Sequence, residues 1–264
     1  MEGPLWTERH APGLEELPQA DLRRSLRRAL AEPMNLVVHG PAGAGKTAAV
    51  RALTRVAHEN PDADRIEINV ADFFELSKKE VGNDPRFARF IDSKRRRNSS
   101  KADLINHVLK ESASYSPVAG AYKTVVLDNA EGMREDFQQA LRRALDPHHE
   151  TTQFVLVPRQ PAAPHAPIPS GRFPGPGRSP PTDEVVAVLE RLVEREGVPF
   201  EREGLEYVAG AAGGDLREAI LSAQTTAESE GEVTMEVAYD TLSAVRTDER
   251  VEEMLDDAEA GAFT

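Results

Sequence analysis

The sequence contains no cysteine, which excludes disulfide bonds and any metal site built from thiolates. It also lacks an apolar core near its N-terminus and any apolar run long enough to cross a bilayer. It therefore carries neither the pattern of a signal peptide nor that of a membrane-spanning helix. We expect a cytoplasmic protein with no membrane partner.

Positive charge is also scarce. The formal net charge is −13 over 264 residues, which argues against a protein whose whole surface attracts nucleic acid. Any contact with DNA must then come from a local basic patch. The length is sufficient for one large domain or two smaller domains with a buried core.

Short apolar runs alternate with helical patterns over residues 1–160. The run at 35–39 ends at a glycine-rich turn, and helical spacing of apolar residues follows from Thr47. Strands are expected at 35–39, 65–70, 123–128 and 152–157, and helices at 47–58, 102–112 and 136–145. This alternation predicts an α/β fold with a parallel sheet covered by helices on both faces.

A change of composition divides the chain. Nine prolines and three glycines fall between Pro158 and Pro181, and neither residue type suits the interior of a strand. From Thr182 onward the apolar spacing is helical. We therefore expect an α/β domain at 1–160, a Pro/Gly-rich connecting segment at 161–181, a small all-helical domain at 182–247 and an acidic tail at 248–264.

A phosphate-binding loop is the strongest motif in the sequence. It consists of Gly40, Pro41, Ala42, Gly43, Ala44, Gly45, Lys46 and Thr47. The glycines let backbone N–H groups turn inward around a β-phosphate, and the helix that follows adds its positive end. Lys46 would reach the β- and γ-phosphates, and Thr47 would hold Mg²⁺. Because a strand precedes this loop and a helix follows it, we predict binding of a nucleoside triphosphate with Mg²⁺.

Asp128 supplies a second element of the same site. It ends the apolar run Val125-Val-Leu-Asp128, and proteins with phosphate loops place the carboxylate that holds Mg²⁺ at the end of such a strand. An acid that merely ends a strand is the alternative. Beside a phosphate loop, we favour the Mg²⁺ role.

Three segments together resemble the AAA+ ATPases: the glycine-rich loop, Val125–Asp128, and Gly214-Asp-Leu-Arg217 in the helical region. Further segments resemble, more narrowly, the small subunits of replication factor C, the clamp loader of archaea and eukaryotes. The sequence of these segments especially resembles that of the second small subunit of halophilic archaea. These segments are Leu5-Trp-Thr-Glu-Arg-His-Ala-Pro12, Asp136-Phe-Gln-Gln-Ala-Leu-Arg-Arg143, Thr152-Gln-Phe-Val155 and Gly213-Gly-Asp-Leu-Arg-Glu-Ala-Ile220.

The resemblance implies a mechanism and a set of partners. Clamp loaders are hetero-oligomeric rings that use ATP to open a sliding clamp and place it on primer–template DNA. Other replication factor C subunits, the clamp and the DNA would then be partners of this chain. Transferred by position, Arg217 would sense the γ-phosphate from a helical lid, and Arg9 and His10 would lie against the adenine.

The sequence departs from the family pattern at several places. Asn129 stands where the family has the glutamate that orients the attacking water, and an amide is a poor proton acceptor. The triplet that carries the arginine finger reads Ser170-Gly171-Arg172, so the arginine is displaced by one residue. Whether Arg172 reaches a neighbour's site stays open. The family also continues into a C-terminal collar domain, which we expect to be absent because the sequence ends at Thr264.

Two groups of basic residues are candidates for contacts with molecules other than ATP. Arg142 and Arg143 are either surface residues of a helix or contacts to a neighbouring subunit. The other group is either a solvated loop or a contact to DNA phosphates. It comprises Lys94, Arg95, Arg96, Arg97 and Lys101.

Three hypotheses follow for function. The first is an ATP-binding clamp-loader subunit with weak or impaired hydrolysis. The second is a structural subunit that binds ATP and hydrolyses none, which Asn129 and Gly171 would favour. The third is an unrelated phosphate-loop enzyme, against which the helical region with its Gly-Asp-x-Arg segment argues.

Overall fold

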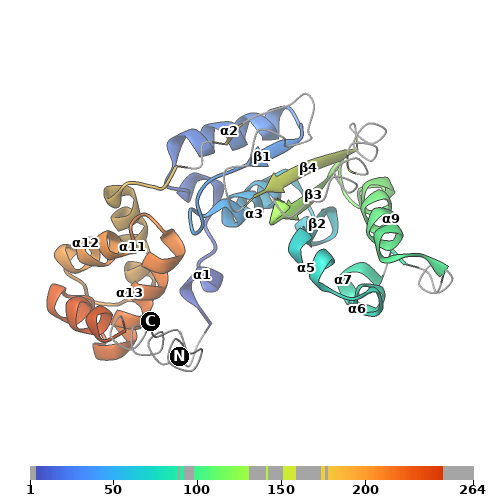
Figure 1. Cartoon of the computed structure of the whole chain (residues 1–264). Helices are drawn as coiled ribbons and strands as arrows, with labels where there is room; N and C mark the ends of the chain where they lie inside the picture. Colours follow the sequence, from blue (N-terminus) through green and yellow to red (C-terminus); the bar gives the residue numbers. More distant parts are fainter. Residues whose placement is uncertain are drawn as a thin grey trace, which may run out of the picture. The chain divides into compact units, whose positions relative to one another are not determined.

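The structure is a computed structural model, and it describes residues 4–88, 90–91, 98–130, 141, 151–158, 174–175 and 178–245. The chain divides into two compact units (Figure 1). One is an α/β unit formed by Pro12–Arg178. The other is a helical unit that combines Met1–Ala11 with Ser179–Thr264.

A parallel sheet forms the centre of the α/β unit. Its strand order is β2-β3-β4-β1-β5, and every neighbouring pair is parallel. The strands are β1 (Leu36–Val38), β2 (Arg65–Asn69), β3 (Lys123–Asp128), β4 (Thr152–Val157) and β5 (Pro174–Gly175). The four strands expected from the sequence are confirmed. The two-residue β5 was not expected, because it lies in the segment rich in proline and glycine.

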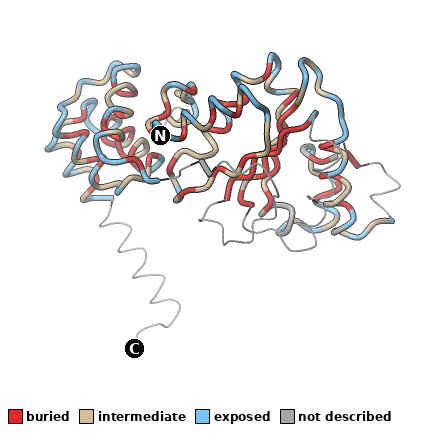
Figure 2. Tube along the Cα trace, turned by 90° about the horizontal axis from the view of Figure 1, so that it is seen from above, coloured by how far each residue is buried: buried red, intermediate tan, exposed pale blue. Residues whose placement is uncertain are grey.

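Successive residues of the central strands contribute to two different hydrophobic cores. Val125 and Leu127 of β3 belong to one core, whereas Val126 between them belongs to the other. This alternation follows from the pleat, which points successive side chains to opposite faces. All these residues are apolar because both faces are covered, which confirms the expected fold class. Figure 2 shows the central strands as a continuous buried region.

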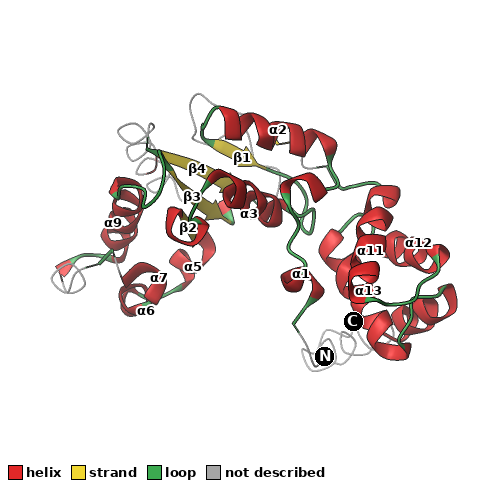
Figure 3. Cartoon of the chain, turned by 180° about the vertical axis from the view of Figure 1, so that it is seen from behind, coloured by secondary structure: helices red, strands yellow, loops and turns green. Residues whose placement is uncertain are grey.

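Helices cover both faces of the sheet. The core on one face includes residues of α2 (Ala20–Ala31) and α3 (Lys46–Ala57). The other core includes residues of α6 (Lys78–Asn83), α7 (Pro85–Ala88) and α9 (Lys101–Ser114) (Figure 3). None of the helices within the described ranges is long and apolar enough to cross a membrane. The other helices in the described part of this unit are η1 (Leu14–Glu16), α4 (Pro61–Asp64) and α5 (Val70–Glu75). Of the helix expected at 136–145, only Leu141 falls within the described residues.

The helical unit packs around one hydrophobic core of its own. Its helices are α1 (Trp6–Arg9), α11 (Thr182–Glu196), α12 (Arg202–Ala211) and α13 (Leu216–Glu230), and residues 235–245 are also helical. Gly197 ends α11 with φ 68°, a left-handed conformation that glycine adopts without strain. The acidic tail expected at 248–264 lies outside the described residues.

Trp6 explains why the first residues belong to the helical unit. We expected the α/β domain to begin at residue 1, but residues up to Ala11 group with the helices. Trp6 is 4% exposed in the helical core, and its backbone N–H donates to Oε1 of Gln224 at 2.8 Å. Burial of one large aromatic side chain therefore attaches the N-terminal segment to helices that lie far from it in the sequence.

We predict that Trp6→Ala destabilises the helical unit. Truncation of a buried aromatic side chain costs about 3–5 kcal/mol, because it loses transfer energy and leaves a cavity. Thermal unfolding followed by circular dichroism measures the effect. Val118→Ala truncates a largely exposed side chain of the α/β unit and serves as a control, with an expected change within about 0.5 kcal/mol. Equal melting temperatures for wild type and Trp6→Ala would contradict the packing described above.

Candidate nucleotide-binding site

The phosphate loop connects the end of β1 to the beginning of α3. Gly43 and Gly45 have φ angles of 67° and 83°, which side chains with a Cβ rarely adopt. Gly45 is the N-cap residue of α3 and has no side chain that could accept from the first N–H groups of the helix. By contrast, α6, α9 and α13 are capped by their own Ser77, Ser100 and Asp215. The beginning of α3 is thus suited to an anion.

Lys46 is held by the loop to which it belongs. Its ammonium donates to the carbonyl oxygens of Gly40 at 2.8 Å and of Pro41 at 2.7 Å. These bonds keep the positive charge at the loop, where it adds to the positive end of α3. Loop and lysine therefore form one electropositive site that fits a triphosphate.

Thr47 and Asp128 meet although 81 residues separate them in the chain. The Thr47 hydroxyl donates to Oδ2 of Asp128 at 3.2 Å. Mg²⁺ prefers oxygen ligands and is commonly held by one or two side chains together with phosphate oxygens and water. The described residues contain no group of three or more His, Asp or Glu side chains that could hold a metal by themselves. Thr47 and Asp128 thus fit a Mg²⁺ ion that arrives with a nucleotide.

Asn129 has a backbone conformation that is uncommon for a residue other than glycine. Its φ is 54° and its side chain is buried; asparagine tolerates this left-handed region better than most residues. Its Nδ2 donates to Oδ1 of Asn69 at 2.7 Å, and its backbone N–H donates to Oδ1 of Asp128 at 2.9 Å. Asn129 therefore contacts both Asp128 and the neighbouring strand.

Two polar residues of the site were missed in the sequence. Asn69 ends β2 directly beside Asp128 in the register of the sheet, and a polar residue at that strand end was the available signal. Gln19 lies buried at the beginning of α2, and its amide donates to the carbonyl oxygen of Ala44 in the phosphate loop at 2.9 Å. No local pattern marked Gln19, because its role depends on a contact across the fold.

Arg51 adds positive charge on α3, one turn beyond Thr47. Its guanidinium forms two hydrogen bonds to Glu67, with distances of 3.2 and 2.6 Å. The pKa of Arg51 is raised mainly by this contact with Glu67 and to a lesser degree by the negative charge of Asp128. Arg51 therefore stays charged near the carboxylate of Asp128.

Arg9 and His10 share one acidic partner within the helical unit. Arg9 donates to both carboxylate oxygens of Glu196, at 2.8 and 2.6 Å, and the His10 ring nitrogen Nε2 contacts the same carboxylate. Desolvation raises the pKa of Glu196, but the hydrogen bonds from His10 and Arg9 outweigh it, so this pKa lies below its ordinary value. Contact of Arg9 and His10 with an adenine stays a prediction.

The remaining predicted residues fall into two groups. Arg217 is exposed in the first turn of α13, and Lys101 begins α9. Their roles toward nucleotide and DNA stay predictions. The others lie outside the described residues: Lys94, Arg95, Arg96, Arg97, Arg142, Arg143 and Arg172.

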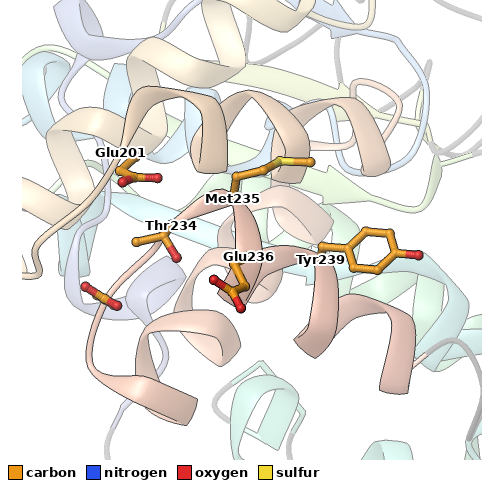
Figure 4. A pocket seen from close by; sticks show the side chains of 6 residues that line it. Glu201, Thr234, Met235, Glu236 and Tyr239 are labelled. Atoms are coloured by element: carbon orange, nitrogen blue, oxygen red, sulfur yellow. The ribbon is translucent and has the colours of Figure 1, made fainter.

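A shallow pocket in the helical unit is a poor alternative for the nucleotide. Its volume is about 520 Å³, and Figure 4 shows its side chains, among them Met235 and Tyr239. Three of its lining residues are glutamates, which would repel a triphosphate. The complete lining is Glu201, Glu232, Thr234, Met235, Glu236 and Tyr239. Charge therefore favours the phosphate loop as the nucleotide site.

Fold and site together define a phosphate-loop nucleotide-binding protein, and comparisons with known proteins agree. Residues 21–162 match the family described as AAA domain. The Replication factor C small subunit of Aeropyrum pernix is 30% identical over 98% of this chain and 73% of its own length. The corresponding subunit of Archaeoglobus fulgidus is 30% identical over 95% of this chain and 71% of its own length. The chain belongs to the replication factor C small subunit family of AAA domain proteins.

A solved structure supports the fold independently. The RuvB Holliday junction branch migration motor of Thermotoga maritima superposes with a TM-score of 0.59 over 87% of this chain and 69% of that chain. Its sequence identity is only 12%. This likeness therefore concerns the fold alone.

We predict that Lys46→Ala weakens ATP·Mg²⁺ binding about ten- to a hundredfold. Loss of hydrogen bonds to a charged group costs about 1.5–3 kcal/mol. Isothermal titration calorimetry measures the affinity. Lys110→Ala, at an exposed position of α9, is a control with the same change of charge and should bind as wild type does. Equal affinities for Lys46→Ala and Lys110→Ala would exclude the loop as the phosphate site.

Proposed function

We propose that this chain is an ATP-binding subunit of a clamp loader, which opens a sliding clamp and loads it onto primed DNA during replication. The observation that carries this proposal is the meeting of Thr47 and Asp128 at a phosphate loop in a member of the replication factor C small subunit family. ATP with Mg²⁺ is the ligand that this arrangement fits best. Its partners would be other replication factor C subunits, the clamp and primer–template DNA.

The proposed roles of individual residues divide between the two units. In the α/β unit, Lys46 binds the β- and γ-phosphates, while Thr47 and Asp128 hold Mg²⁺. In the helical unit, Arg217 senses the γ-phosphate, and Arg9 and His10 lie against the adenine. The exposed position of Arg217 at the beginning of α13 leaves its guanidinium accessible to such a ligand.

We further propose that hydrolysis by this subunit is weak. Asn129 takes the place of the glutamate that the family uses to orient water. Its side-chain amide donates a hydrogen bond to Asn69. A carboxamide accepts a proton poorly, so a general base is lost from this position. The displaced Arg172 would likewise be a poor arginine finger for a neighbouring subunit.

Contacts to other macromolecules complete the proposal. Arg142 and Arg143 would contact a neighbouring subunit. A local basic group would bind DNA phosphates without reading sequence; it comprises Lys94, Arg95, Arg96, Arg97 and Lys101. The acidic composition, with a net charge of −13, supports similarity to the second small subunit of halophilic archaea.

A second candidate function is that of a structural subunit that binds ATP and hydrolyses none. The observation that favours it is again Asn129. Its side chain is an amide and not a carboxylate, and this amide is hydrogen-bonded to Asn69. Both candidates share ATP binding at the phosphate loop. They differ in turnover, so a measured rate separates them.

Clamp loading by a reconstituted assembly tests the proposed function. The wild-type chain, Lys46→Ala and Lys110→Ala are each combined with the other loader subunits, a fluorescent clamp and primed DNA. We expect clamp loading with wild type and Lys110→Ala, and a marked loss with Lys46→Ala. Loading that is equal with and without the chain would reject the function.

We predict slow phosphate release by the isolated wild-type chain and faster release by Asn129→Glu once a neighbour supplies an arginine. General-base catalysis contributes about 10²–10⁴-fold. Glutamate cannot donate to Asn69 and tolerates the φ of 54° less well than asparagine, so the rate must be referred to the folded fraction of each variant. Brisk release by the isolated wild type would contradict the role assigned to Asn129.

A further inference from the structure

Asn69 and Asp128, the last residues of β2 and β3, lie side by side. Asn69 pairs with Asp128 in the register of these parallel strands. Asn129 follows Asp128 and turns into the left-handed conformation with φ 54°. Its side chain reaches Asn69 on the neighbouring strand, 60 residues away in the sequence.

The hydrogen bonds fix the orientation of both carboxamides. The backbone N–H of Ala71 donates to Oδ1 of Asn69 at 3.1 Å. A backbone N–H can only donate, so the oxygen of Asn69 must face it. The atom of Asn129 that contacts this oxygen at 2.7 Å must then be its nitrogen, Nδ2. The first turn of α5 thereby determines the orientation of Asn129.

Asn129 in turn holds Asp128. Its backbone N–H donates to Oδ1 of Asp128 at 2.9 Å, and the Thr47 hydroxyl donates to Oδ2 at 3.2 Å. Both oxygens of the carboxylate thus have a donor, one from the turn after β3 and one from α3. A carboxylate restrained on both sides loses little conformational freedom when it engages Mg²⁺, which demands near-ideal octahedral geometry.

We propose that Asn69 is a positioning residue for Asp128 and acts through Asn129. This inference rests on the proposed function, since it concerns the same ATP·Mg²⁺ site. The carboxamide of Asn69 anchors the side chain of Asn129, which keeps the left-handed turn in place. That turn aims a backbone N–H at the carboxylate of Asp128. The carboxamide at position 129 donates to Asn69, which an ionised glutamate cannot do.

The test is the dependence of ATP affinity on Mg²⁺ in the full chain. Isothermal titration calorimetry with ATP is performed once in MgCl₂ and once in EDTA, and the ratio of the two affinities is the readout. Loss of a net hydrogen bond changes an equilibrium about two- to tenfold. We expect the ratio to fall by this factor in Asn69→Ala, while affinity in EDTA stays near the wild-type value.

Three further variants separate positioning from general stability. Asn129→Gly removes the side chain but accepts the positive φ, and it should lower the ratio to a similar extent. Since Asn69 acts through Asn129, the double variant should be no worse than either single variant. Asn35→Ala is the matched control, because Oδ1 of Asn35 accepts the backbone N–H of Phe154 at 2.9 Å, in the same unit but at the other end of the sheet. It should lower the melting temperature and leave the ratio unchanged.

The outcomes distinguish this inference from the proposed function. A wild-type chain that binds no ATP in MgCl₂ would overturn both. A wild-type chain whose binding depends on Mg²⁺, together with an unchanged ratio in Asn69→Ala, would overturn only the positioning role. Equal losses of the ratio in Asn69→Ala and Asn35→Ala would also overturn it, because a merely structural role would then explain both.

Discussion

The contact between Thr47 and Asp128 depends on the parallel order of the sheet. β1 and β3 are not neighbours, since β4 lies between them. Even so, Thr47, in the helix that follows β1, meets Asp128, the last residue of β3, at 3.2 Å. Carboxyl ends of parallel strands share one edge of a sheet, so loops that are far apart in sequence converge there. This constraint places the helix dipole, the lysine and the carboxylate at one site.

The same edge of the sheet carries Asn129, which we propose as a departure from the family pattern. Asn129 is integrated into its surroundings by two hydrogen bonds and by a backbone conformation that asparagine tolerates. The amide that we propose in place of an acid therefore has a hydrogen-bonding partner of its own in Asn69. Under the proposed roles, binding and hydrolysis are separable, because Lys46, Thr47 and Asp128 would hold phosphate and Mg²⁺ whereas the residue at position 129 would activate water.

The helical unit has an independent basis for its stability. Its core is separate from the two cores that flank the sheet, and the N-terminal segment is attached to it through Trp6. The shared ion pairs of Arg9 and His10 with Glu196 add a polar attachment at the end of α11. Residues on both sides of the α/β unit in the sequence therefore belong to one packed body.

Much of the fold and of the phosphate site was predictable from the sequence by itself. Short contiguous segments predict the four longer strands, the glycine-rich loop and the place of Asp128, because strand burial and loop conformation depend on local composition. The missed contacts all join distant residues. Gln19 and Ala44 lie 25 positions apart, Asn69 and Asn129 lie 60 apart, and Trp6 and Gln224 lie 218 apart. Only the tertiary structure decided these pairs, since a polar or aromatic side chain finds its partner through the packing of whole elements and not through its neighbours in the chain.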